Sequence, residues 1–466
     1  MKKLAFKGIL PRLWFAAVAL AVAAPSRADD PPSRPNVLFI AVDDLNDWAG
    51  FLGGHPQART PNLDRLAARG VHFTRAYCSA PACNPSRTSL MTGLQPSTTG
   101  VYHNNQPWRP VLPDAVTLPQ HFSAAGYDVA GGGKLFHNSF NDRDSWPEWF
   151  GLKGSDHPKP EQTPVNGIPG AAHFDWGPLD VPDEAMGDSK TVSWAIDWLQ
   201  ADREAPFFLA VGLIRPHLPW YTPRAYFDHY PVDEIILPET LANDLDDLPP
   251  AGIAMARPDG DHRKVVAAGQ WEKAVQGYLA SIEFADAQIG RLLDALDASG
   301  HRDDTIIVFW GDHGWHLGQK QHWRKFALWE EATRVPLIVV APGLTEADGR
   351  SDRTVSLLDL YPTLIDLCRL PGRPELEGES LAPLLRDPGA PRDRPALTTH
   401  GRGNHAVRSE RWRYIRYADG SEELYDHQAD PREWTNLAAD PRWQSVKDEL
   451  SSHLPSTDAP DAPPAR

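Results

Sequence analysis

A cysteine and an arginine lie close together in the segment Cys83-Asn84-Pro85-Ser86-Arg87, and this pair could bind and attack an anion. The segment opens a stretch that is predicted to be helical, and the amino end of a helix offers unpaired N–H groups and a positive dipole. The Arg87 guanidinium adds a planar pair of donors that suits oxyanions. The spacing is too short for a tyrosine phosphatase, and Cys83 could equally be an inert, buried residue. The segment therefore predicts an anion site with a candidate nucleophile.

Three aspartates that follow predicted strands could bind a divalent cation. Asp43 and Asp44 come at the end of the strand predicted at 36–42, and Asp312 follows the strand predicted at 305–310. Neighbouring carboxylates at the end of a buried strand repel each other unless a cation lies between them, and Ca²⁺ and Mg²⁺ prefer such oxygen ligands. Each aspartate alone could cap a helix or a turn, but the three together favour a metal site. The next residue, His313, could be a further ligand or could donate a hydrogen bond to a substrate.

Two lysines and two histidines in loops are further candidates for catalysis. Lys134 and His137 follow a run of three glycines, which lets a substrate approach the backbone closely. His217 stands between two prolines, and Lys325 follows a loop that begins after His313. A single lysine is usually a solvated charge, and a single histidine is more often structural. The predicted metal site and Arg87 strengthen the functional interpretation of all four.

These residues follow strands that alternate with helices along the chain. Short runs rich in Val, Ile, Leu and Phe predict strands at 36–42, 127–130, 207–213 and 305–310. Amphipathic stretches predict helices at 64–69, 115–125, 188–203, capped by Asp188, and 270–299. Such alternation is typical of an α/β sheet with helices on both faces. Ligands of such sheets bind beyond the carboxyl ends of the strands, which is where the candidate residues lie.

Other regions predict loops, a second subdomain and a tail. Segments 141–187 and 231–262 lack clear periodicity and are expected to form binding loops or lids. A catalytic domain is expected at 35–390. It is followed at 391–454 by a small antiparallel subdomain, because alternating residues and an Asp-Gly turn signal occur there. The last residues, 455–466, are rich in Pro, Ala and Asp and are expected to be disordered.

Residues 1–28 have the pattern of a cleavable signal peptide. Basic residues precede the apolar run Leu13–Ala24, and small residues follow it as a cleavage site. The run is too short to span a bilayer, and no other stretch is predicted to insert into a membrane. The mature protein is therefore expected to be secreted or periplasmic.

The composition limits the partners of the mature chain. Removal of the leader, which has five Lys/Arg and no Asp/Glu, changes the formal charge from −16 to −21. An acidic surface disfavours nucleic acid and anionic lipid as partners. An anionic substrate must then be attracted by a local basic pocket. The three cysteines are too few for a disulfide scaffold.

Taken together, these motifs give the chain a specific resemblance. From about residue 35 to about residue 450 it resembles the type I sulfatases of the alkaline-phosphatase-like superfamily, and most resembles their iduronate-2-sulfatase branch. The motifs that carry the resemblance are Val42-Asp43-Asp44-Leu45, Cys83–Arg87 with Thr92-Gly93, Gly133–His137, Pro216–Pro219, and Gly311–Trp315 through Lys325-Phe326. The resemblance implies an α/β fold with a mixed sheet sandwiched by helices and a smaller C-terminal antiparallel sheet.

The resemblance also implies a mechanism. A separate maturation enzyme reads Cys-x-Pro-x-Arg and oxidises Cys83 to formylglycine, whose hydrate attacks sulfur through one hydroxyl. Asp43, Asp44, Asp312 and His313 join position 83 around calcium. The resemblance implies that Arg87 stabilises the hydrate and that Lys134 and Lys325 bind sulfate oxygens. It also implies that His217, with Lys325, protonates the leaving alcohol. His137 would remove the proton of the second hydroxyl.

The expected activity is hydrolysis of a sulfate ester on a polysaccharide or glycosaminoglycan fragment, with a 2-O-sulfated uronate as one candidate. Many arylsulfatases have Asn at the place of His313, and the segment Tyr102–Asn105, Trp108 and Arg109 match the family's sugar-binding loops only in part. Asn105, Trp108 and Arg109 could line a sugar site or could serve packing. Two alternatives are a phosphoester or phosphonate hydrolase of the same superfamily and a non-catalytic secreted protein that binds sulfated glycans.

Overall fold

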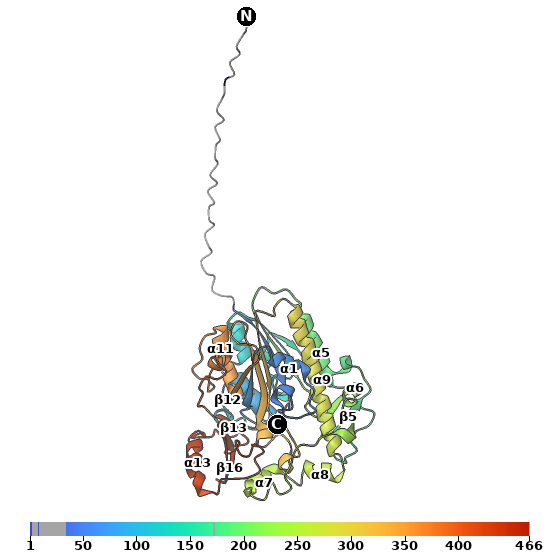
Figure 1. Cartoon of the computed structure of the whole chain (residues 1–466), viewed down its shortest axis with the longest axis vertical. Helices are drawn as coiled ribbons and strands as arrows, with labels where there is room; N and C mark the ends of the chain where they lie inside the picture. The colour runs from blue at the N-terminus through green and yellow to red at the C-terminus, as the bar shows by residue number, and fades with distance from the viewer. Residues whose placement is uncertain (2–7, 9–33, 171–172, 466) are drawn as a thin grey trace. The chain divides into compact units, whose positions relative to one another are not determined.

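An eight-stranded mixed sheet lies at the centre of the unit that begins at Pro35 (Figure 1). The computed structural model describes residues 1, 8, 34–170 and 173–465, so the predicted signal peptide lies outside the described residues except for residues 1 and 8. All strands run parallel except β11. In spatial order the strands are β12 (Gly349–Ser356), β2 (Val71–Tyr77), β11 (Arg334–Val340), β8 (Thr305–Gly311), β1 (Asn36–Val42), β6 (Phe207–Leu213), β3 (Asp128–Gly133) and β4 (Glu148–Phe150).

Helices cover both faces of this sheet, because its central strands are apolar on both sides. Strands β1, β6 and β8 are buried along their whole length, as expected for parallel strands between two helical layers. Alternate residues of β1 enter two separate hydrophobic cores. One core contains α1 (Pro61–Ala67), α5 (Gly187–Leu199) and α9 (Trp271–Ala298), and the other contains α2 (Cys83–Thr92), α4 (Leu118–Ala124) and α11 (Leu360–Cys368). Figure 1 shows α5 and α9 on one side of the sheet and α11 on the other.

The four predicted strands and four predicted helices are all present, with ends shifted by a few residues. The cap assigned to Asp188 is wrong, because α5 begins at Gly187 and Met186 occupies the N-cap position. The two aperiodic segments are mostly irregular. In their described residues the elements are short: β4, β5 (Trp176–Leu179), α7 (Pro250–Ala256), the start of α8 (Asp261–Ala267) and three 3-10 helices at Arg143–Ser145, Asp183–Ala185 and Val232–Glu234. Shorter elements elsewhere are α3 (Pro96–Thr99), α6 (Arg224–Phe227), α10 (Glu330–Thr333), α12 (Ala382–Arg386), β7 (Trp220–Pro223), β9 (His316–Leu317) and β10 (Trp323–Arg324).

A small antiparallel sheet follows the main one, as predicted. Its strands are β13 (Ala396–Thr399), β14 (His405–Arg408), β15 (Trp412–Arg416) and β16 (Glu422–Asp426), and α13 (Gln444–Ser451) closes it. The turn between β15 and β16 contains Gly420 with a φ of 85°, a conformation that glycine adopts without strain. Residues from 35 onward form one compact unit, so the division at residue 390 stays a prediction.

The tail was expected to be disordered, but it lies against the loop around residues 97–105. Three backbone N–H groups of the tail donate to carbonyls of that loop: Ala459 to Ser97 (2.7 Å), Ala462 to Gly100 (2.8 Å) and Ala465 to Asn105 (2.7 Å). In return, the Tyr102 hydroxyl donates to the Ala459 carbonyl and the Gln106 amide donates to the Ala462 carbonyl. The loop therefore supplies the hydrogen bonds that order the tail, and the composition of the tail could not reveal these partners.

A chain that ends at Leu454 is expected to lose the order of this loop. Its backbone amides should exchange hydrogen for deuterium faster because the tail no longer pairs with their segment. Hydrogen-exchange mass spectrometry of peptides covering residues 97–106 measures the change. A peptide from β15 serves as the internal control, and unchanged protection of the loop would show that the tail does not hold it.

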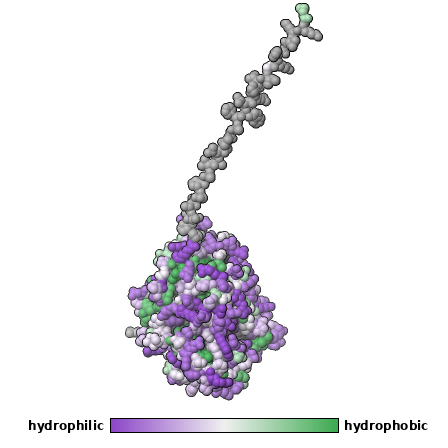
Figure 2. All heavy atoms as spheres, turned by 60° about the vertical axis from the view of Figure 1, so that its left-hand side comes forward, coloured by the Kyte–Doolittle hydropathy of each residue, from purple (hydrophilic) through white to green (hydrophobic). Residues whose placement is uncertain are grey.

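One face of the molecule is mainly hydrophilic, consistent with the acidic composition. Figure 2 shows a face on which hydrophilic residues predominate. Within the described part of the chain, no helix has both the length and the apolar character that a membrane crossing requires.

Candidate active site

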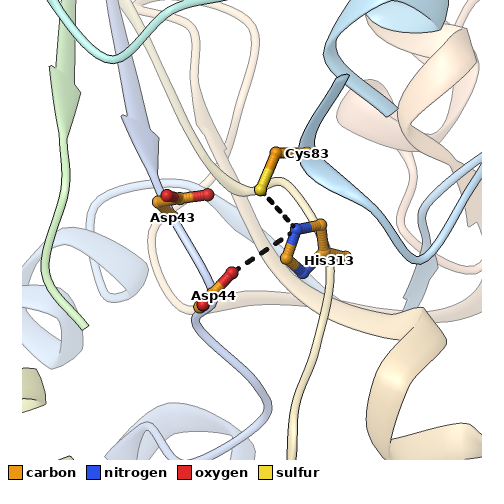
Figure 3. Close-up of side chains that lie close together, drawn as sticks. All are labelled: Asp43, Asp44, Cys83 and His313. Atoms are coloured by element: carbon orange, nitrogen blue, oxygen red, sulfur yellow. Dashed lines mark hydrogen bonds and ion pairs between the residues drawn. The ribbon is translucent and has the colours of Figure 1, made fainter. Parts of the chain in front are cut away.

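The carboxyl ends of the central strands bring the predicted residues together around Cys83. Asp43 and Asp44 follow β1, Asp312 and His313 follow β8, and Lys134 follows β3. Cys83 is the first residue of α2, whose ten residues are all buried. Figure 3 shows Cys83 and His313 facing Asp43 and Asp44 across a short gap. The sheet therefore gathers side chains that are up to 270 positions apart in the sequence.

Three cationic or polar nitrogen atoms surround the Cys83 sulfur. Lys325 Nζ lies 3.0 Å, His313 Nε2 3.4 Å and Lys134 Nζ 3.7 Å from Sγ. Burial alone would raise the pKa of Cys83, but the charges of these neighbours hold it well below the usual thiol value. The site therefore stabilises negative charge at position 83.

Arg87 binds carboxylates of the chain itself. Its Nε donates to Asp312 Oδ2 at 2.8 Å, and its Nη2 lies 3.4 Å from Asp43 Oδ1. Nη1 donates to the backbone carbonyls of Lys134 and Leu135. The guanidinium is fully buried, so the anion that Arg87 meets is the aspartate pair rather than an incoming ligand.

The carboxylates fit a divalent cation. Ligand atoms of Asp43, Asp44, Cys83 and His313 all lie within 4.8 Å of one another. Asp44 Oδ2 is buried and makes no hydrogen bond, which leaves a hard oxygen donor free for a metal. Burial and the charges of Asp43 and Cys83 raise the pKa of Asp312 to about 7, against the effect of Arg87. The unpartnered oxygen of Asp44 and the carboxylates beside it are the kind of ligands that a divalent cation takes.

Asp312 belongs to the same cluster, although it stands outside the tightest group of ligand atoms. Its Oδ1 accepts the backbone N–H of Asp44 at 3.1 Å, and its Oδ2 lies 3.4 Å from His313 Nε2. Burial lowers the pKa of His313, but Asp312 and Cys83 outweigh that effect and raise it to about 9. His313 thus faces both the carboxylates and position 83, as a ligand or a donor must.

Both predicted lysines are buried beside the aspartates. Lys134 Nζ contacts Asp43 Oδ2, and Lys325 Nζ lies 2.6 Å from Asp44 Oδ1. Burial opposes their charge, yet the neighbouring carboxylates and Cys83 raise the pKa of each above the usual lysine value. Both ammonium groups therefore stay charged at the sulfur of Cys83, where an anionic substrate would gain two ion pairs.

The two predicted histidines lie beside different members of this cluster, His217 near Asp44 and His137 near Cys83. His217 Nδ1 is 2.6 Å from the Leu218 carbonyl, so that nitrogen carries a proton and Nε2 lies 3.9 Å from Asp44 Oδ2. His137 hydrogen-bonds the Cys83 side chain, and its Nδ1 is buried without a partner. Each histidine has one ring nitrogen directed at the reacting region, which suits proton transfer.

Three residues that hold the site in place were not identified from the sequence. The Asn84 N–H donates to Asn104 Oδ1, 20 positions further along the chain, at 2.9 Å and fixes the start of α2. The Tyr278 hydroxyl donates to the Asp44 carbonyl at 2.7 Å. Asp188 accepts the N–H groups of Ile214 and Arg215, and so fixes the segment before His217. All three act through partners that sequence spacing does not reveal.

Trp108 and Arg109 serve packing, the second of the two interpretations left open above. Trp108 is 1% exposed and its ring stacks on Phe136, with the centroids 5.3 Å apart. Arg109 Nη2 lies 2.6 Å from Asp142 Oδ2, and its guanidinium covers the Trp108 ring. Asn105 is exposed, and its carbonyl accepts the N–H of Ala465. Neither Trp108 nor Arg109 is free to contact a sugar.

The segment Glu330–Thr333 packs against the residues that follow Asp312 and His313. The Gly314 N–H donates to the Ala332 carbonyl, and a Cβ at Gly314 would lie 2.0 Å from the Glu331 carbonyl oxygen, so only glycine fits. The Glu331 side chain is half-buried, with Oε2 3.6 Å from His316 Nε2. Burial, with the charges of Glu433 and Asp47, raises the pKa of Glu331 from 4.5 to about 8.

Glu331→Gln is therefore expected to stabilise the protein at alkaline pH relative to the parent. Between pH 4.5 and about 8 the unfolded parent ionises Glu331 while the folded parent keeps the proton, so its stability falls as the pH rises. The amide does not titrate and removes this loss. Melting temperatures of both proteins at about pH 5 and about pH 8.5 measure the difference. An equal gap at both values would show that Glu331 ionises normally.

Comparisons with known proteins agree with this geometry. The sequence model of the sulfatase family matches residues 35–370, and that of the N-sulphoglucosamine sulphohydrolase C-terminal region matches residues 311–459. A sulfatase of Formosa agariphila is 40% identical over 91% of this chain and 87% of its own length. Human iduronate 2-sulfatase is 33% identical over 80% of this chain and 72% of its own length. The relatives of this chain thus include an iduronate 2-sulfatase, in agreement with the predicted resemblance.

The fold has solved counterparts. A phosphonate monoester hydrolase from Silicibacter pomeroyi superposes with a TM-score of 0.75 at 22% identity, over 90% of this chain and 94% of its own. This likeness confirms the predicted alkaline-phosphatase-like fold. With the family matching most of its length, the chain belongs to the sulfatases, the hydrolases of sulfuric esters.

Proposed function

We propose that this sulfatase is exported and removes sulfate from a saccharide, on a polysaccharide or glycosaminoglycan fragment, using formylglycine made from Cys83 and a bound calcium ion. The observation that carries the proposal is the convergence of Lys134, Lys325 and His313 on position 83, beside Asp43 and Asp44. The similarity to human iduronate 2-sulfatase supports a sulfated sugar as substrate and makes a 2-O-sulfated uronate one candidate.

In this proposal, residues of the chain itself bind the sulfate group and keep the metal-binding carboxylates in position. Formylglycine would supply a hydrated aldehyde with a nucleophilic hydroxyl, and calcium, held by Asp43, Asp44, Asp312 and His313, would neutralise negative charge there. Lys134 Nζ and Lys325 Nζ lie on two sides of position 83 and would bind sulfate oxygens. Arg87 keeps Asp43 and Asp312 in place through its two-sided contact.

Two histidines move protons in this proposal. His217 donates from Nε2 to the leaving alcohol, because its Nδ1 proton is held by the Leu218 carbonyl. His137 contacts the side chain of residue 83 from another direction and would accept a proton there. An acid and a base on separate elements allow the alcohol and the sulfate to leave in separate steps.

The test is a comparison of matched sulfate, phosphate and phosphonate esters of 4-nitrophenol. The enzyme is produced with a formylglycine-generating maturation enzyme, and mass spectrometry of the peptide around residue 83 measures conversion. We expect the highest kcat/KM for the sulfate ester, since two lysines and one cation site suit its single charge. A preference for the phosphate or phosphonate ester would instead favour the alternative activity of the superfamily.

A further inference from the structure

A cavity of about 420 Å³ opens beside the catalytic cluster and shares two of its residues. Lys134 and His217 form part of its wall. The cavity has the volume of a ligand site, for which about 300–1,000 Å³ is usual. Because His217 protonates the leaving alcohol in the proposed function, the cavity lies on the side where that alcohol must be.

Another part of the wall comes from β4 and the residues that follow it. It presents the aromatic residues Trp149 and Phe150 together with Leu152. The Phe150 ring is already stacked on Trp194, with the centroids 5.4 Å apart and the planes within 12°. The Trp149 ring meets Trp146 at a tilt of 45°, and the Arg143 guanidinium lies over it, 5.6 Å from the centroid. Of these two rings in the wall, Trp149 is the one without a stacked aromatic partner, so it can offer a ring face to the C–H face of a sugar.

Two polar groups in the wall can bind hydroxyls. Asn141 Oδ1 is buried and has no hydrogen-bond partner, so it can accept from a ligand. Asp156 Oδ2 lies 3.0 Å from Arg215 Nη1, which fixes the carboxylate and leaves its other oxygen 3.8 Å from His157. Both groups are hydrogen-bond acceptors, which a ring with several hydroxyls would satisfy.

The charge of the wall disfavours a carboxylated ring. Among the described residues that line the cavity, the basic side chains are Lys134, which is paired with Asp43, and His217. Asp156 is itself paired with Arg215, so a sugar carboxylate would give up its hydration in this cavity without gaining an unpaired cation. An uncharged ring meets no such cost.

We propose that this cavity binds the ring of the leaving alcohol and that the ring is an uncharged pyranose, stacked on Trp149 and hydrogen-bonded to Asn141 and Asp156. This inference rests on the proposed function, and it replaces a uronate with a neutral sugar at the position of cleavage. The cavity then selects the substrate, while the catalytic cluster supplies the reaction.

The test measures kcat/KM of the matured full-length enzyme for 4-nitrophenyl sulfate and for two matched monosulfated disaccharides, one with the sulfate on a neutral hexose and one with it on a uronate. We expect a preference for the neutral hexose of about tenfold or more. Trp149→Ala should lower kcat/KM for that disaccharide about tenfold more than for nitrophenyl sulfate. Asn141→Ala should shift the same ratio in the same direction and provides a second reading if Trp149→Ala folds poorly.

Trp443→Ala is the matched control, because Trp443 is half-buried against Trp412 in the C-terminal subdomain and does not line the cavity. It should leave the ratio unchanged. Preference for the uronate, or an equal effect of the cavity variants on all three substrates, would overturn the pocket assignment while the sulfatase activity stands. A matured enzyme that hydrolyses no sulfate ester would overturn the proposed function and the pocket with it.

Discussion

Replacing Cys83 with alanine is expected to lower kcat/KM for 4-nitrophenyl sulfate by about 10⁴-fold or more, because the variant loses the group that becomes the nucleophile. The binding groups around it remain, since Lys134, Lys325 and His313 are each held by aspartates as well as by the sulfur. The loss should therefore appear in kcat more than in KM. Steady-state kinetics of parent and variant, prepared with the same maturation enzyme, measure it.

Cys78→Ala is the matched control for that variant. Cys78 is also fully buried, but burial raises the pKa of its thiol, and its sulfur lies 3.9 Å from the Ala332 carbonyl. It has no lysine beside it and should be inert. We expect this variant to lose some stability and to keep its turnover. Retention of full activity by Cys83→Ala would exclude any covalent role for position 83.

Asp44→Asn is expected to lower activity by about 10³-fold and to reduce the calcium content of the purified protein. Asp44 Oδ2 has no hydrogen-bond partner, so this oxygen is available to bind a metal. Replacement by an amide removes one negative charge from the cluster and weakens cation binding. Metal analysis by mass spectrometry and activity after chelation and calcium addition measure the two effects.

Asp47→Asn controls for the loss of a nearby carboxylate. Asp47 lies three residues further along the chain and pairs with Arg334 at 3.1 Å, with a quarter of its side chain exposed. A partly exposed pair contributes little to stability, so calcium content and activity should stay near those of the parent. Normal metal content in Asp44→Asn would mean that the cation, if bound, depends on other residues.

The sequence was sufficient to predict the site because its residues follow strand ends. Asp43, Asp44 and Asp312 come directly after runs that read as buried strands, and the parallel sheet brings such ends to one edge. The start of helix α2 was also predicted from the sequence, since Cys83 begins a helical stretch that ends before Gly93. Local pattern and sheet topology together predicted that these residues come together, and the structure shows that they do.

The positioning contacts could not be predicted in the same way. Tyr278 supports Asp44 from 234 positions away, and Asp188 holds the backbone before His217 across 26 and 27 positions. The contacts of Arg87 with Asp43 and Asp312 were likewise not predicted from its motif. Such partners depend on how the elements pack, which neither propensity nor periodicity encodes.

The burial of α2 has a consequence for how active enzyme is made. Every residue of the Cys-x-Pro-x-Arg segment is inaccessible in the folded chain, so a modifying enzyme can reach it only before folding is complete. Under the proposed function, oxidation of Cys83 and folding then compete in time, and the fraction of active molecules depends on the ratio of the two rates. A molecule that folds first keeps its thiol until it unfolds again. Where oxidation of Cys83 limits the yield, slowing the folding of the chain would produce more active enzyme than raising the stability of the folded state would.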